Sequence, residues 1–167
     1  MVAGAPGDGW PTGRLGPAGV TDPAPQEVPD PVFQAPVAHL LRRRVAQCPT
    51  WLPVVGGSMG RTIRTGSEVL VAASAEPRFG EVWAFCNSEG VLVVHRFLRR
   101  RQDEFYFQGD AHRPDPPAPR ERLVGRVLRI RYGGVERGLG EQDRLTGGAR
   151  LVLRQRARAV AVRLGLR

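Results

Sequence analysis

The chain contains no lysine, because all 25 of its Lys and Arg residues are arginine. The missing amine excludes Schiff-base enzymes, Walker-type phosphate loops and Ser/Lys catalytic dyads. The two cysteines, Cys48 and Cys86, are too few for a disulfide-rich scaffold or for a zinc site without histidine. No spacing typical of metal ligands joins them to His95 or His112, so we expect no metal and no cofactor.

Long apolar runs are also missing. No window holds about 18 consecutive apolar residues, so the sequence predicts no transmembrane helix. Residues 1–35 lack the basic start and apolar run of a secretory signal. These absences predict a cytoplasmic protein. A formal net charge of +9 favours an anionic partner and allows peripheral contact with an anionic membrane.

Both ends of the chain differ in composition from the middle. Residues 1–35 are rich in Gly, Pro and Ala and have few large apolar groups, which predicts a disordered tail. From Pro36 to Gln47, apolar residues recur at helical spacing and predict a short helix. Residues 133–167 predict a linker over Gly133–Gly140 and then a basic amphipathic helix over Ala149–Leu164. That helix would pack on the rest of the protein or lie on an anionic membrane.

The middle of the chain has the pattern of β structure. Short runs rich in Val, Leu, Ile and Phe are separated by turn residues, with no helical run between them. The predicted strands are Trp51–Val55, Glu68–Ala72, Glu81–Cys86, Val91–Leu98, Glu104–Gln108 and Leu123–Tyr132. Asn87–Gly90 is typical of a hairpin loop. We therefore predict a mainly β protein in which residues 36–132 form an antiparallel, barrel-like domain with a leading helix.

Two residues in this region are candidates for chemistry. His95 stands in the apolar run Val91–Phe97, where strand propensity does not call for an imidazole. Ser58 follows two glycines after an apolar strand, and glycine permits tight turns and close backbone approach. Alone, each signal is weak, since a strand histidine is commonly a core residue and a Gly-Gly-Ser segment is commonly a plain loop.

The order of the surrounding blocks is more specific. Gly-Gly-Ser-Met at Gly56–Met59 precedes Val-Val-His-Arg at Val93–Arg96, and Gly-Asp-Ala-His at Gly109–His112 leads to Asp115. Over residues 51–132 this order resembles the signal peptidase I superfamily, which also contains the self-cleaving SOS-type repressors. Histidine in place of lysine resembles the endoplasmic-reticulum and archaeal type of signal peptidase.

The resemblance implies a serine endopeptidase that cuts a leader or pro-segment of a polypeptide bound as an extended strand. By resemblance Ser58 is the nucleophile, His95 is the general base, and Asp110 or Asp115 orients the imidazole. The Ser58 backbone N–H would bind the oxyanion. Members of the family that cleave preproteins carry a membrane anchor, which we do not find in this sequence, so the substrate class stays open.

Two departures from the family pattern favour a different reading. Arg61 stands where the family usually has proline, and Ser67 stands where it usually has aspartate. A non-catalytic peptide-binding module of the same fold is therefore one alternative. A self-cleaving repressor-like regulator is another, although the chain lacks both an upstream helix-turn-helix and the lysine base. Nucleic-acid binding ranks lower, because no aromatic residues interleave with the arginines. Cys86, a rival nucleophile, has no glycine-rich loop and is expected to be a buried apolar residue.

Overall fold

The computed structural model of the chain describes residues 35–163. The disordered tail predicted for residues 1–35 therefore lies outside the described residues, except for Ala35, and so does Leu164. The elements in chain order are α1 (Ala35–Gln47), β1 (Thr50–Pro53), β2 (Glu68–Ala72), β3 (Val82–Cys86), β4 (Leu92–Arg101), β5 (Glu104–Gln108), β6 (Ala118–Pro119), the 3₁₀-helix η2 (Arg120–Arg122), β7 (Leu123–Tyr132), β8 (Val135–Gly138) and α2 (Glu141–Arg163).

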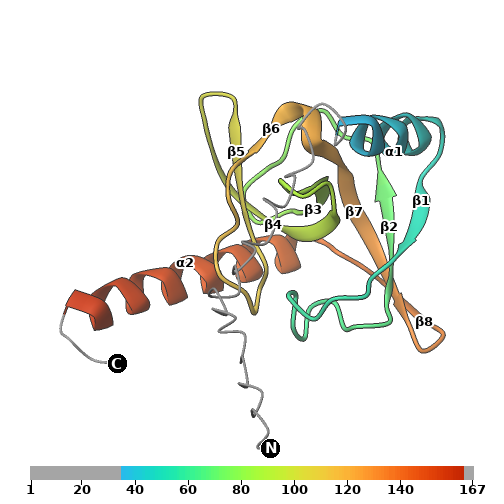
Figure 1. The fold of residues 1–167 in the computed structure, drawn as a ribbon. Helices are drawn as coiled ribbons and strands as arrows, with labels where there is room; N and C mark the ends of the chain where they lie inside the picture. The colour runs from blue at the N-terminus through green and yellow to red at the C-terminus, as the bar shows by residue number, and fades with distance from the viewer. Residues whose placement is uncertain (1–34, 164–167) are drawn as a thin grey trace, which may run out of the picture.

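The strands form one antiparallel sheet in the order β1-β2-β7-β3-β4-β5-β6, and β8 pairs with β7. The sheet curls into a half-barrel (Figure 1). Its central strand β3 is buried at all five positions, because both faces are covered there. The prediction of a mainly β, antiparallel protein with two helices is confirmed at this level.

The alternation of side chains along β3 divides the core into two clusters. Val82, Ala84 and Cys86 belong to an aliphatic cluster. Trp83 and Phe85 point the other way, into an aromatic cluster. The register aligns His95 with Trp83 and Arg96 with Val82. His95 and Arg96 are therefore sent to opposite faces of the sheet, and both side chains are buried.

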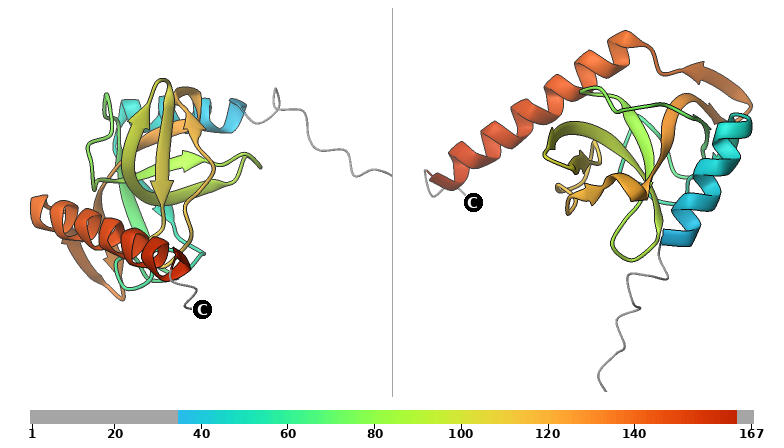
Figure 2. Two further views of the ribbon diagram at one scale, coloured as in Figure 1. Left: turned by 90° about the vertical axis from the view of Figure 1, so that its left-hand side faces the viewer. Right: turned by 90° about the horizontal axis from the view of Figure 1, so that it is seen from above.

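The two helices lie on different sides of the curled sheet (Figure 2). Helix α1 contributes Ala38 and Val45 to the aliphatic cluster, and Arg42 Nε donates to the Leu123 carbonyl oxygen at 2.9 Å. Only the first half of α2 has buried residues, Gly148 and Leu151, while its C-terminal part projects past the strands (Figure 1). None of the described helices is both long and apolar enough to cross a membrane.

The predicted boundaries are accurate for β2, β5 and β7, and the hairpin turn at Asn87–Gly90 joins β3 to β4 as expected. The prediction of a linker over Gly133–Gly140 was wrong. Gly133 and Gly134 adopt positive φ values of 57° and 79° and turn the chain back, so that β8 pairs with β7. All four β8 residues are exposed, so the strand lacks the apolar alternation by which strands are predicted.

Helix α2 begins at Glu141, eight residues before the predicted start at Ala149. The early part contains Gly147 and Gly148, which intrinsic propensity disfavours in a helix. Tertiary packing explains both glycines. A Cβ atom at Gly148 would lie 2.7 Å from the Phe79 ring, and one at Gly147 would lie 2.3 Å from Arg96 Cζ.

The aromatic cluster yields a stability prediction. The ring of Phe107 stacks on that of Phe85 at 4.3 Å between centroids and meets the edge of Phe97 at 5.6 Å. We expect Phe107→Ala to lower the free energy of unfolding by about 3–5 kcal/mol, because it leaves a cavity. Urea unfolding followed by tryptophan fluorescence measures the change. The exposed Val91→Ala is the control, with an expected change within about 0.5 kcal/mol, and equal effects of the two variants would contradict the core assignment.

Candidate active site

Ser58 lies on a loop, Val54–Ser67, that the backbone closes at its base. Val54 N–H donates to the Ser67 carbonyl oxygen at 2.8 Å, and Gly66 N–H donates to the Val54 carbonyl oxygen at 2.9 Å. Within the loop, Met59 and Ile63 are fully buried in the aliphatic cluster. These anchors hold Ser58 at a partly exposed position in a turn.

The structure brings together three of the four predicted site residues. Ser58 Oγ lies 2.7 Å from His95 Nε2, although the two residues are 37 positions apart in the chain. On the other side of the ring, His95 Nδ1 lies 2.5 Å from Asp115 Oδ2. Since a carboxylate only accepts hydrogen bonds, the Nδ1–H donates to Asp115 and leaves Nε2 to accept the Ser58 hydroxyl proton. This is the arrangement of a serine nucleophile with an oriented base.

Burial limits the freedom of this group. The His95 side chain is 4 % exposed and that of Asp115 is 15 % exposed. The edge of the Phe85 ring packs against the imidazole, with 6.2 Å between centroids. Asp115 N–H donates to the Phe107 carbonyl oxygen at 3.1 Å, which fixes the acid beside the end of β5. The imidazole is thus packed on its flank and hydrogen-bonded at both nitrogens.

Gly109 is the residue that allows the chain to pass this close to the site. A Cβ atom there would lie 2.6 Å from the Ser58 carbonyl oxygen and 2.9 Å from His95 Nε2. Two residues later, Ala111 N–H donates to the same Ser58 carbonyl oxygen at 2.8 Å. The segment Gly109–Ala111 therefore packs against the Ser58 backbone and holds it beside the imidazole.

Asp110 has a different place from Asp115. Its carboxylate accepts two hydrogen bonds from Arg96, from Nε to Oδ1 and from a terminal nitrogen to Oδ2, each at 2.8 Å. Thr62 Oγ1 donates to Oδ2 at 2.5 Å. Of the two acids left open by the sequence, Asp115 is the one hydrogen-bonded to His95, and Asp110 joins the Ser58 loop to β4.

Arg96 is a residue whose role the sequence did not reveal. Its side chain is 1 % exposed. Besides Asp110, it donates to the Gly80 carbonyl oxygen at 2.6 Å and to the Asp143 carbonyl oxygen of α2 at 3.2 Å. Gly147 of α2 lies directly against the guanidinium. The only sequence signal for this role was the alternation of side chains along the strand, which places Arg96 on the face opposite to His95. The partners of Arg96 come from distant segments of the chain, so the sequence did not indicate them.

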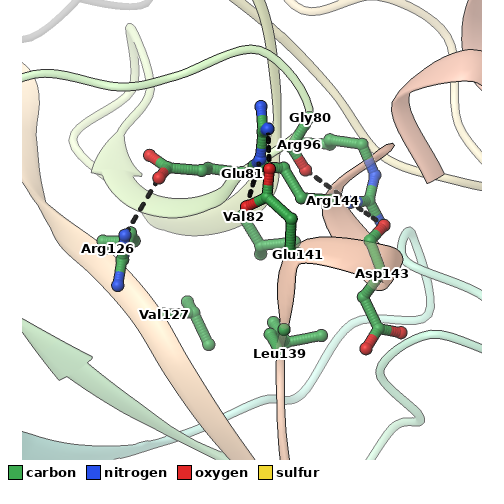
Figure 3. A pocket seen from close by; sticks show the side chains of 11 residues that line it. Gly80, Glu81, Val82, Arg96, Arg126, Val127, Leu139, Glu141, Asp143 and Arg144 are labelled. Atoms are coloured by element: carbon green, nitrogen blue, oxygen red, sulfur yellow. Dashed lines mark hydrogen bonds and ion pairs between the residues drawn. The ribbon is translucent and has the colours of Figure 1, made fainter. Parts of the chain in front are cut away.

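A cavity of ≈ 210 Å³ lies on the α2 side of Arg96, between β3, β7 and the start of α2. It contains neither Ser58 nor His95. Figure 3 shows Glu81 extended toward Arg126, to which it is bonded at 3.0 Å. The Arg144 guanidinium beside Glu141 lowers the pKa of that carboxyl. Each carboxylate side chain that lines the cavity has an arginine partner, so its charges are matched.

The two departures from the family pattern lie on the Ser58 loop. Arg61 is exposed. Ser67 is buried, and its Oγ has no hydrogen-bond partner among the described residues. Only the backbone of Ser67 therefore contributes to closing the loop.

The cysteines are placed differently from the serine. Cys48 is exposed and Cys86 is buried. Burial raises the pKa of the Cys86 thiol, an effect that the charge of Arg122 only partly offsets. Within residues 35–163, His, Cys, Asp and Glu side chains form no group of three or more that could hold a metal ion.

We expect iodoacetamide at pH 8 to modify Cys48 in the native protein and to leave Cys86 unmodified. The thiolate is the reactive form, and a raised pKa lowers its fraction at any given pH. Peptide mass spectrometry before and after unfolding in urea measures both sites, with Cys48 as the internal control. Equal modification of the two thiols in the native protein would contradict this prediction.

The close approach at Gly109 gives a second prediction. Gly109→Ala should slow acylation of Ser58 by p-nitrophenyl acetate at least about 100-fold, because small misplacements of reacting groups cost rate steeply. Gly56→Ala is the matched control, since its Cβ meets no atom within 4 Å. Both variants are first compared by melting temperature. A folded Gly109→Ala protein with an unchanged acylation rate would show that the close approach at Gly109 is not needed for acylation.

At this site, hydrogen bonds join the Ser58 hydroxyl to the His95 imidazole and the imidazole to the Asp115 carboxylate. This arrangement suits transfer of an acyl group. Comparison with known proteins adds no family to this geometry: no protein-family model matches the chain, and no curated protein has a similar sequence.

Proposed function

We propose that the protein is a serine endopeptidase in which Ser58 is the nucleophile, His95 the general base and Asp115 the orienting acid. The observation that carries the proposal is the pair of hydrogen bonds on the imidazole, at 2.7 Å to Ser58 Oγ and 2.5 Å to Asp115 Oδ2. Both are within the reach that proton transfer requires.

In the proposed reaction, His95 Nε2 takes the Ser58 hydroxyl proton while Oγ attacks the scissile carbonyl carbon. The imidazolium then gives this proton to the leaving amine as the peptide bond breaks, which leaves an acyl ester on Ser58. A water molecule, deprotonated by the same Nε2, attacks the ester and returns the serine. Asp115 keeps the proton on Nδ1 and stabilises the imidazolium.

The tetrahedral intermediate carries an oxyanion that needs hydrogen-bond donors. We assign the Ser58 backbone N–H to this role, as the resemblance implies. The loop supports the assignment, because Ala111 holds the carbonyl group of the same residue and the buried Met59 fixes the next one. Loss of one such donor typically costs about 2.7–4 kcal/mol in the barrier.

The proposed substrate is a polypeptide bound as an extended strand. Among residues 35–163, strand β1 pairs only with β2, and none of these residues pairs with its other edge, which suits strand addition. The chain runs from β1 through the exposed Val55 and the exposed Gly56 to Ser58. A peptide added at this edge would be led to the nucleophile. The curled antiparallel sheet is compatible with the signal peptidase I superfamily, and we propose that relationship for the β domain, in its Ser/His branch.

Substitution of each member of the group tests the proposal. We expect Ser58→Ala to abolish acylation by p-nitrophenyl acetate and cleavage of a mixed synthetic peptide library. His95→Ala should bring both rates close to background. Asp115→Asn should lower kcat by up to about 10⁴-fold, the loss seen when the acid of a Ser-His-Asp triad is neutralised. Acylation is located by peptide mass spectrometry and cleavage by the new termini.

Asp103→Asn is the control for the acid, because that side chain is 95 % exposed on the β4–β5 hairpin. It should leave both rates unchanged. Acylation at a residue other than Ser58, or peptide cleavage that survives in Ser58→Ala, would refute the mechanism. Acylation of Ser58 without any peptide cleavage would refute the endopeptidase assignment and favour a binding module of the same fold.

A further inference from the structure

Two adjoining hollows run along α2 beside the candidate site. One, of ≈ 460 Å³, lies between the Ser58 loop and α2, and the other, of ≈ 470 Å³, lies between Gln108–His112 and α2. The two hollows adjoin, because they share Asp110, Ala111, Leu151 and Arg154, and the surface that they make up together is treated as one trough. We call it the arginine trough, because its lining includes Arg61, Arg150, Arg154 and Arg158.

The arginines of the trough are not neutralised. All four are exposed, and none has an ion-pair partner among residues 35–163. Arg154 donates to the Asp110 carbonyl oxygen at 2.6 Å. The one carboxylate in the lining is that of Asp110, and both of its oxygens are already bound by Arg96. From Arg144 to Arg163, α2 has no acidic residue.

The cavity on the other side of Arg96 provides a contrast. There, each carboxylate has an arginine partner, and Figure 3 shows the pairs of Glu81 with Arg126 and of Glu141 with Arg144. Charged side chains that only stabilise the fold can be paired with an opposite charge, as these are. In the trough, four arginines line the two hollows and have no acidic partner among the described residues, and this arrangement suits an anionic ligand.

The position of the trough ties it to Ser58. Its wall includes Met59 and Thr62, which follow the serine on the same loop, and Ala111, whose N–H is bonded to the Ser58 carbonyl oxygen at 2.8 Å. The trough therefore begins at Met59, the residue after Ser58, although Ser58 and His95 themselves do not line it. From Arg150 to Arg158 the helix rises about 12 Å, at about 1.5 Å per residue. This length matches about four residues of extended peptide.

We propose that the arginine trough binds an acidic stretch of the polypeptide substrate, about four residues long, beside the bond that is cleaved. The proposal rests on the proposed function, and it names the substrate class. Guanidinium groups pair with carboxylates through two parallel hydrogen bonds, so Asp and Glu side chains suit the trough. Its lining has no Phe, Tyr or Trp on which bases could stack, which favours a peptide over a nucleic acid.

Binding is measured on the full chain carrying Ser58→Ala, so that no turnover occurs. The probes are a fluorescein-labelled peptide of four glutamates and its four-glutamine counterpart, followed by fluorescence anisotropy. We expect the glutamate peptide to bind more tightly, with an affinity that falls as salt rises. Adding Arg150→Gln and Arg158→Gln together should weaken its binding by about two- to thirtyfold, the range for two exposed ion pairs.

The matched control is Arg43→Gln with Arg44→Gln. Both arginines are exposed on α1, on another side of the sheet, so the loss of charge is the same. This pair should leave the affinity unchanged. Equal binding of the two peptides, or equal loss in the two double variants, would overturn the proposal. Tighter binding of a labelled tetrauridylate that depends on Arg150 and Arg158 would also overturn it and assign the trough to nucleic acid.

Cleavage provides the test at the level of substrate. In the mixed peptide library, the active chain should prefer peptides with Asp or Glu beside the cut, and Arg150→Gln with Arg158→Gln should remove this preference. An unchanged preference in that double variant would overturn the substrate assignment. If the glutamate peptide binds to the trough but no peptide is cut and Ser58 is not acylated, the proposed function fails while the anion site stands.

Discussion

The site depends on one close approach, in which the main chain at Gly109 lies against both the Ser58 carbonyl oxygen and His95 Nε2. The gap admits no side chain, since a Cβ atom would lie 2.6 Å from the Ser58 carbonyl oxygen. From this point the same segment supplies Ala111 to the serine and Asp115 to the histidine. The turn at Gly109 thus helps to hold both Ser58 and His95 in place.

Beneath this turn, the ion pair of Arg96 and Asp110 ties four parts of the chain together. It connects β4 to the Gly109 turn, to the Ser58 loop through Thr62, and to α2 through the Asp143 carbonyl group. A buried pair is weak evidence for added stability, because both charges lose hydration. The pair nevertheless fixes the position of β4. Arg96 donates hydrogen bonds to four acceptors, so the strand that carries His95 cannot shift without breaking these bonds.

Much of the architecture was accessible from the sequence. The alternation of apolar and turn residues predicted the strands β2, β5 and β7 to the residue, because each buries at least one face. Strand β8 escaped prediction because its four side chains are exposed and its order comes from backbone pairing with β7. Helix α2 was predicted too short, since Gly147 and Gly148 lower helix propensity while the packing against Arg96 and Phe79 requires them.

The sequence by itself determined which reactive side chains the protein contains. Without lysine, the side chains that could act as a base near neutral pH are histidines and carboxylates, and the apolar run around His95 marks that residue as a candidate. Tertiary structure alone decided between the two acids. Asp110 and Asp115 are five residues apart in one polar turn, and local spacing does not distinguish them. The folded chain does, because β4 sends His95 and Arg96 to opposite faces, where Asp115 meets the imidazole and Asp110 meets the guanidinium.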